Sequence, residues 1–173
     1  MIEFANDRIG GDQRPYIVAE AGVNFRDDID LAKAFISEAA AAGADAVKFQ
    51  THLQSAEMVE SEMRALDMGE LYDRMASYER SMAAHRELMT HCEDHGVTFL
   101  STPFSPAGVE RLEELGVDAY KVGSGELTNH HLLRTIAETG KPMIVSTGMH
   151  DMDTVKKAAE LLEEHASAFM FLY

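Results

Sequence analysis

Apolar residues recur in this chain with a strand-like period and a helix-like period in strict alternation, from residue 16 to the end. Strands separated by single helices pair in parallel through right-handed crossovers, so the pattern predicts an α/β fold on a parallel sheet. A longer segment, residues 51 to 82, interrupts the alternation and predicts a loop with a short helix around 71–78. The predicted strands are 16–20, 46–50, 97–101, 119–122, 142–146 and 168–172, and the predicted helices are 29–42, 83–95, 105–115, 130–139 and about 151–165.

Helix-capping residues support these boundaries. Asp27 or Asp28 and Asp151 or Asp153 are suitable N-caps, and Pro106 fits the first turn of its helix. Glycines end four of the predicted helices, where a positive φ is needed: Gly43, Gly96, Gly116 and Gly140.

Two architectures satisfy this alternation, a doubly wound sheet and a (β/α)8 barrel. No Gly-x-Gly-x-x-Gly follows the first predicted strand, where a dinucleotide fold would carry it. Polar residues instead follow nearly every strand, as expected when strand ends meet at one barrel mouth. We therefore predict an incomplete (β/α)8 TIM barrel, with about six of eight strands, forming a single partial barrel domain over residues 1–173.

Composition excludes several classes of function. The formal net charge of −15 argues against a nucleic acid or an anionic membrane as partner. The single cysteine, Cys92, rules out an intrachain disulfide framework and is expected to be a packed thiol. No apolar run is long enough to span a bilayer and the N-terminus lacks a signal-peptide pattern, so we expect a cytoplasmic protein.

Two segments of similar sequence each place a lysine at the end of a predicted strand. Gly43–Lys48 reads GADAVK, and Gly116–Lys121 reads GVDAYK. Burying an ammonium group is costly unless a negative group meets it. Lys48 shares its strand face with Gln50. The partner of each lysine could be a buried carboxylate such as Glu20, or an anionic ligand, and the repetition favours the ligand.

Small hydroxyl-bearing turns follow three strands and suit phosphate or carboxylate oxygens. They are Ser101–Ser105, Gly123–Glu126 and Ser146–Gly148. Glu20, at the end of the first strand, is either a lysine counter-ion or a group for proton transfer and substrate positioning. His52 could face the barrel mouth.

The remaining histidines predict no site. His91 and His95 have metal-ligand spacing, but they lie on a predicted outer helix and we do not assign a metal to them. His130 and His131 begin a helix and are expected at the surface.

Five segments in order resemble the sialic acid synthase family, which comprises N-acetylneuraminate synthase and its relatives. From about residue 14 onward they cover nearly the whole chain, and together they are highly specific. The segments are Tyr16–Asn24, Val47–His52, Phe99–Ser105, Ala119–Glu126 and Lys141–Met149.

The resemblance implies a TIM-barrel enzyme that condenses phosphoenolpyruvate with an open-chain N-acylated hexose, such as N-acetylmannosamine or its 6-phosphate. The products are a nine-carbon 2-keto sugar acid and phosphate. By motif, Lys48 and Lys121 would hold the carboxylate and phosphate of phosphoenolpyruvate, and Glu20 and Gln50 would lie beside the reacting carbons. Hydroxyl donors to the phosphate would be Thr102, Ser124 and Ser146.

The chain departs from the family pattern in three places. Asn24, expected near the sugar, is followed by Phe-Arg-Asp where the family often has His-Asn-Gly or His-x-Gly. The segment 53–81, which can carry sugar specificity, matches only loosely. The chain also ends before the strands that supply two metal-binding histidines and before the antifreeze-like domain.

These departures lead to several expectations. The full-length family is expected to use Mn²⁺ or Mg²⁺ with ligands not present in this chain, and to form a homodimer. The chain alone is expected to bind phosphoenolpyruvate poorly and to be inactive. Two alternatives stay open: a Schiff-base aldolase with Lys48 or Lys121 as nucleophile, and a non-catalytic, anion-binding barrel remnant.

Overall fold

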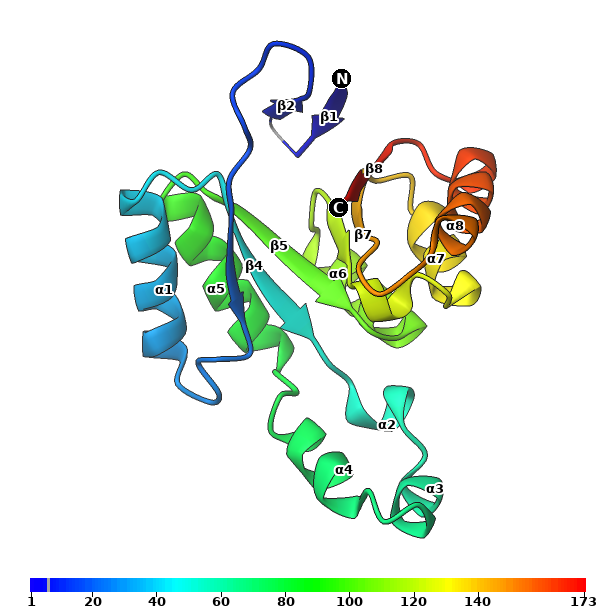
Figure 1. Cartoon of the computed structure of the whole chain (residues 1–173). Helices are drawn as coiled ribbons and strands as arrows, with labels where there is room; N and C mark the ends of the chain where they lie inside the picture. The colour runs from blue at the N-terminus through cyan, green and yellow to red at the C-terminus, as the bar shows by residue number, and fades with distance from the viewer. Residues whose placement is uncertain (6) are drawn as a thin grey trace. The chain divides into compact units, whose positions relative to one another are not determined.

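The computed structural model describes residues 1–5 and 7–173, and it divides into two compact units. One unit is Ile17–Leu115; the other combines Met1–Tyr16 with Gly116–Tyr173. The ribbon of both is drawn in Figure 1.

The unit Ile17–Leu115 is built on three parallel strands. They are β3 (Val18–Gly22), β4 (Ala46–Thr51) and β5 (Thr98–Pro103), with β4 in the middle. Helices α1 (Ile29–Ala41) and α5 (Met82–Asp94) pack against each other beside these strands, and α6 (Pro106–Leu115) follows β5 (Figure 1). The stacked rings of Phe49 and Phe99, with centroids 5.4 Å apart, join neighbouring strands in the apolar layer.

Three short helices separate β4 from α5 and extend away from the strands of this unit (Figure 1). They are α2 (Gln54–Glu57), α3 (Glu60–Ala65) and α4 (Gly69–Ala76). The sequence predicts only the last of them, because α2 and α3 have four and six residues, too few to show a helical period.

The second unit also holds three parallel strands, β6 (Tyr120–Val122), β7 (Met143–Ser146) and β8 (Phe169–Leu172), with β7 in the middle. A 3-10 turn, η1 (Ser124–Glu126), follows β6, and helices α7 (His130–Ala137) and α8 (Met152–His165) pack together. An antiparallel hairpin of β1 (Ile2–Phe4) and β2 (Asp7–Ile9) belongs to this unit.

The predicted caps are present. Asp28 accepts a hydrogen bond from the Leu31 amide, Asp151 accepts one from the Thr154 amide, and α6 begins at Pro106. The first predicted strand is wrong at both ends, because β3 spans Val18–Gly22 rather than 16–20. The hairpin at the N-terminus was not predicted. In the part of the chain that the structure describes, no helix is long and apolar enough to cross a membrane.

Candidate active site at the strand ends

Five of the predicted site residues gather in the unit Ile17–Leu115, and we call them the first strand-end cluster. Glu20 lies opposite Lys48 in the register of β3 and β4, and Gln50 lies opposite Thr102 in that of β4 and β5. Because residues in register on parallel strands share a face, these four side chains lie on one face of the sheet. The fifth, Asn24, follows β3 and donates to the Ala21 carbonyl at 3.2 Å.

Lys48 forms an ion pair with Glu20. The lysine side chain is 12% exposed and the glutamate side chain 50% exposed, so the pair reaches solvent through the carboxylate. The sequence favoured an anionic ligand as the partner of Lys48, but the structure pairs Lys48 with the internal carboxylate of Glu20. An anion approaching Lys48 therefore meets a carboxylate beside the ammonium group.

Gly22 makes room for this cluster. Its φ of +59° is left-handed, and a Cβ atom there would lie 3.3 Å from Glu20 Oε1 and 4.0 Å from Gln50 Nε2. The Asn24 amide nitrogen would be 3.9 Å away. The ends of the Glu20, Gln50 and Asn24 side chains therefore converge on Gly22, which has no side chain.

The hydroxyl of Thr102 is buried and has no hydrogen-bond partner, with the residue only 2% exposed. A neighbouring threonine is fully satisfied: Thr51 Oγ1 lies 2.8 Å from Ser101 Oγ and 3.1 Å from His85 Nε2. Buried polar groups in folded proteins are nearly always paired, so the Thr102 hydroxyl is one of few exceptions and is free to donate to an acceptor.

Three further predicted residues form the second strand-end cluster, in the other unit: Lys121, Ser124 and Ser146. Lys121 is 6% exposed, and its Nζ donates at 2.6 Å both to the Ser146 hydroxyl and to the Val122 carbonyl. Ser124 begins η1, and its hydroxyl is 3.8 Å from where a Gly148 Cβ would stand. A Cβ atom at position 148 would therefore be in ordinary van der Waals contact with Ser124.

A family comparison decides how this arrangement is classified. The model of the NeuB family matches residues 35–173.

The chain belongs to the NeuB family.

Among its relatives is the N,N'-diacetyllegionaminic acid synthase of Campylobacter jejuni, 37% identical over 157 residues, which cover 87% of this chain and 47% of that protein. The human N-acetylneuraminate-9-phosphate synthase is 34% identical over 173 residues, covering 95% of this chain and 47% of that protein. The NeuB-family chain thus spans about half the length of these relatives.

Solved structures confirm the predicted fold class, an α/β TIM barrel with six of eight strands. The sialic acid synthetase of Leptospira borgpetersenii, in complex with citrate, has a TM-score of 0.85 and 28% identity, over 98% of this chain and 58% of that one. A truncated 3-deoxy-D-arabino-heptulosonate 7-phosphate synthase of Thermotoga maritima shares the fold alone, with a TM-score of 0.66 and 10% identity over 90% of this chain and half of that one.

Sequence reasoning missed a supporting network beside Gln50 in this NeuB-family chain. Its Oε1 is 2.9 Å from His52 Nε2, and the other ring nitrogen of His52 is 2.9 Å from Glu57 Oε2. The ring of Phe104 stacks on His52 with centroids 4.2 Å apart. Only the position of His52, two residues beyond Gln50, signalled this in the sequence.

His150 also escaped prediction. Its Nε2 lies 2.8 Å from the carbonyl of Ser124, so the ring donates to η1 and holds the turn that carries Ser124. The signal in the sequence was its position just after the Ser146–Gly148 turn.

The histidines of α5, His91 and His95, share a serine partner on α1. His95 Nδ1 donates to the His91 carbonyl at 2.8 Å, so its Nε2 accepts from the Ser37 hydroxyl at 3.1 Å. His91 Nε2 lies 3.0 Å from the same hydroxyl. Cys92 is buried, and burial raises the pKa of its thiol to about 12. The predicted surface positions of His130 and His131 are confirmed.

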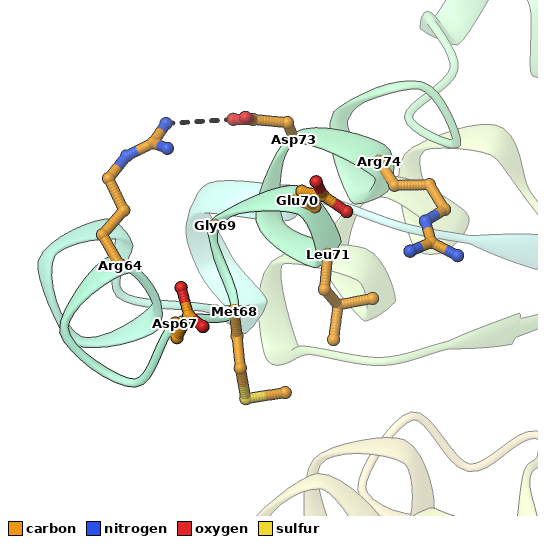
Figure 2. Close-up of a pocket in the computed structure, with 8 residues that line it drawn as sticks. All are labelled: Arg64, Asp67, Met68, Gly69, Glu70, Leu71, Asp73 and Arg74. Atoms are coloured by element: carbon orange, nitrogen blue, oxygen red, sulfur yellow. Dashed lines mark hydrogen bonds and ion pairs between the residues drawn. The ribbon is translucent and has the colours of Figure 1, made fainter.

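Two hollows lie in this unit, and one of them adjoins the first strand-end cluster. A pocket of about 260 Å³ beside α1 is lined by Glu20 and Asn24 together with Phe35 and Glu38. A larger, open hollow of about 720 Å³ lies on α3 and α4, where Arg64 reaches Asp73 at 3.0 Å (Figure 2). Its lining carries both signs of charge and none of the predicted site residues, so we assign it no function.

Across residues 1–5 and 7–173, no group of three or more His, Cys, Asp or Glu side chains is arranged to hold a metal ion. The residues described therefore do not fit the divalent metal that the resemblance implies.

Proposed function

We propose that this chain is the phosphoenolpyruvate-binding part of a sialic-acid-type synthase. C3 of phosphoenolpyruvate attacks the aldehyde of an open-chain N-acylated hexose and forms the new C–C bond. Water adds at C2, and the C–O bond to phosphate breaks. The products are a nine-carbon 2-keto sugar acid and inorganic phosphate, so all atoms of both substrates and the water are accounted for.

The two clusters supply the cations and donors that this reaction needs. Fixed positive charge around an anion whose charge redistributes stabilises the transition state. In our proposal Lys121 and the hydroxyls of Ser124 and Ser146 bind anionic oxygens. Lys48, beside Glu20, binds the substrate carboxylate and holds Glu20 near the reacting carbons. Citrate in the similar Leptospira protein is a polyanion and is consistent with this assignment.

The observation that carries the proposal is the unpaired, buried hydroxyl of Thr102 beside Gln50. An unpaired buried hydroxyl costs about 1–3 kcal/mol, and a phosphate oxygen accepting from it would recover that energy. Asn24, next to Gly22, would contact the sugar.

The aldolase alternative receives no support from the lysines. A Schiff-base nucleophile must be a free amine. Lys48 is ion-paired with Glu20, and Lys121 donates to two oxygens. We expect no covalent adduct on borohydride treatment with pyruvate, and a trapped adduct at either lysine would favour the aldolase.

We propose that the full-length protein uses a divalent metal ion and is a homodimer in the cytoplasm. Within it, residues 1–173 form a partial barrel domain. We also propose that the chain alone releases no detectable phosphate.

A hybrid enzyme tests the proposal. This chain would replace the matching region of the Campylobacter N,N'-diacetyllegionaminic acid synthase, and phosphate release would be measured with phosphoenolpyruvate, Mn²⁺ and the candidate N-acyl sugars. We expect release that requires both substrates and is lost in Lys121→Met. Release from a folded hybrid that is unaffected by Lys121→Met, or no release with any sugar, would contradict the proposal. The non-catalytic alternative predicts phosphate binding without turnover.

A further inference from the structure

A hydrogen-bonded chain of three polar side chains starts at Gln50 and runs into the protein through His52 and Glu57. His52 lies between Gln50 and Glu57, at 2.9 Å from each. The side chains of His52 and Glu57 are only 6% and 7% exposed. Glu57 closes α2, the helix that follows β4 directly (Figure 1).

Both ends of this chain are held in place. The second oxygen of Glu57 accepts a hydrogen bond from the Leu53 amide at 2.7 Å, so both carboxylate oxygens have a partner. The His52 ring is stacked on Phe104 with an interplanar angle of 11°, and the His52 backbone bridges that of Glu79. The imidazole therefore cannot turn away from Gln50 without losing the stack and the ion pair.

The atoms in contact define the direction of each hydrogen bond. A carboxylate can only accept, so His52 Nδ1 carries a proton. The carbonyl oxygen of Gln50 lies at His52 Nε2, an arrangement that a ring protonated on both nitrogens would hold, with Glu57 as its counter-ion. The amide nitrogen of Gln50 is then left on the side of Gly22, where Glu20 and Asn24 converge.

We propose that His52 is a positioning residue that decides which end of the Gln50 amide faces the substrate. As an imidazolium it holds the carbonyl of Gln50, so the NH₂ group is presented as a donor to substrate oxygens. When His52 loses a proton, it loses the one on Nε2, because Glu57 retains the other. Nε2 then accepts, and Gln50 turns its amide over and presents an oxygen to the substrate instead.

This role rests on the proposed function only in taking Gln50 as a substrate-facing residue. The titratable groups around His52 are Glu57 on α2, Tyr78 after α4 and Glu79 at the backbone bridge; Lys48 lies two residues away on β4. Of these, Glu57 forms an ion pair with His52, 2.9 Å from Nδ1, and it fixes the proton on that nitrogen.

Nitrogen-15 NMR of the labelled chain tests the orientation without any activity. As the pH is raised, we expect the Nε2 signal of His52, and not its Nδ1 signal, to change to that of an unprotonated nitrogen. The Gln50 NH₂ signals should move at the same pH. His52→Phe keeps a ring for Phe104 and should abolish that movement, whereas the exposed His130→Phe should not. Loss of the Nδ1 proton first, or Gln50 signals that ignore His52, would overturn the proposal.

A second measurement uses phosphoenolpyruvate as the probe. Affinity should fall about fivefold to tenfold in His52→Phe, the equivalent of one hydrogen bond. Affinity should also fall as the pH rises through the transition seen by NMR in the unmodified chain, and His52→Phe should remove this dependence. If no binding is seen while the NMR behaviour is as expected, the proposed function fails and the positioning of Gln50 stands. If binding is seen but is pH-independent and equal in both proteins, the positioning role fails.

Discussion

Glu20 and Lys48 lie opposite each other in the register of β3 and β4 and form an ion pair at the edge of the first strand-end cluster. The carboxylate is half exposed, while the ammonium group is largely covered. The pair therefore controls how much positive charge an incoming anion meets.

Replacing Glu20 and replacing Lys48 should change the affinity for an anion in opposite directions. Glu20→Gln removes a repulsive charge and should strengthen phosphoenolpyruvate binding severalfold, whereas Lys48→Met should weaken it about tenfold. Glu20→Gln should also lower the free energy of unfolding by about 1–3 kcal/mol, because the largely covered ammonium group of Lys48 loses its charged partner. Titration of both variants by calorimetry measures this, and equal changes in both would contradict the assignment.

Thr102 and Thr51 should respond differently to the same substitution. Thr102→Val removes a hydroxyl without a partner and should leave the free energy of unfolding unchanged or raise it by up to about 1 kcal/mol. Thr51→Val strands the Ser101 hydroxyl and His85 Nε2, and should cost about 1–3 kcal/mol. Urea unfolding of the two variants provides the comparison. A large loss in Thr102→Val would mean that its hydroxyl is already satisfied.

His85 should make stability depend on pH. Burial lowers the pKa of His85 below its usual 6.5, the charges of Arg111 and Arg80 lower it further, and a hydrogen bond to the Ser81 carbonyl opposes them. Below pH 6.5 His85 binds a proton in the unfolded chain more readily than in the folded chain. The contribution of His85 to the free energy of unfolding therefore falls as the pH falls. Above pH 6.5 both states are neutral at this residue, and its contribution is constant. His85→Gln should flatten the acid limb of a plot of unfolding free energy against pH, and an unchanged limb would assign it to other groups.

Cys92 should be unreactive in the folded chain. Its thiol is buried and the pKa of about 12 leaves almost no thiolate at neutral pH. A thiol reagent should modify it only after unfolding, at a rate that rises with urea. Rapid modification in native buffer would show that α5 opens readily.

The sequence was sufficient for the strand and helix order, because capping residues such as Asp28 and Pro106 and the alternating apolar periods are local signals. It also placed Lys48 and Gln50 on one face, since that follows from strand geometry. The repeated lysine segments favoured a ligand as the partner of Lys48, whereas the structure pairs this lysine with Glu20. That contact depends on the register between β3 and β4, which the sequence does not give.

Local sequence patterns could not predict the contacts made by the segment after β4. Glu57 reaches His52 only because the short α2 folds back on the end of β4, and the stack with Phe104 joins residues 52 positions apart. The hairpin of β1 and β2 was missed because each strand has three residues, too few to show a period.

The most direct test is phosphoenolpyruvate binding to the purified chain, measured by NMR titration at constant pH. We predict weak, saturable binding with a Kd on the order of 1 mM, weakened at least about tenfold in Lys121→Met and about fivefold in Thr102→Val. The exposed Lys156→Met serves as the control and should bind as the unmodified chain does. Binding that is equal in all four folded proteins, or lost equally in Lys156→Met, would contradict the assignment of the strand ends as the phosphoenolpyruvate site.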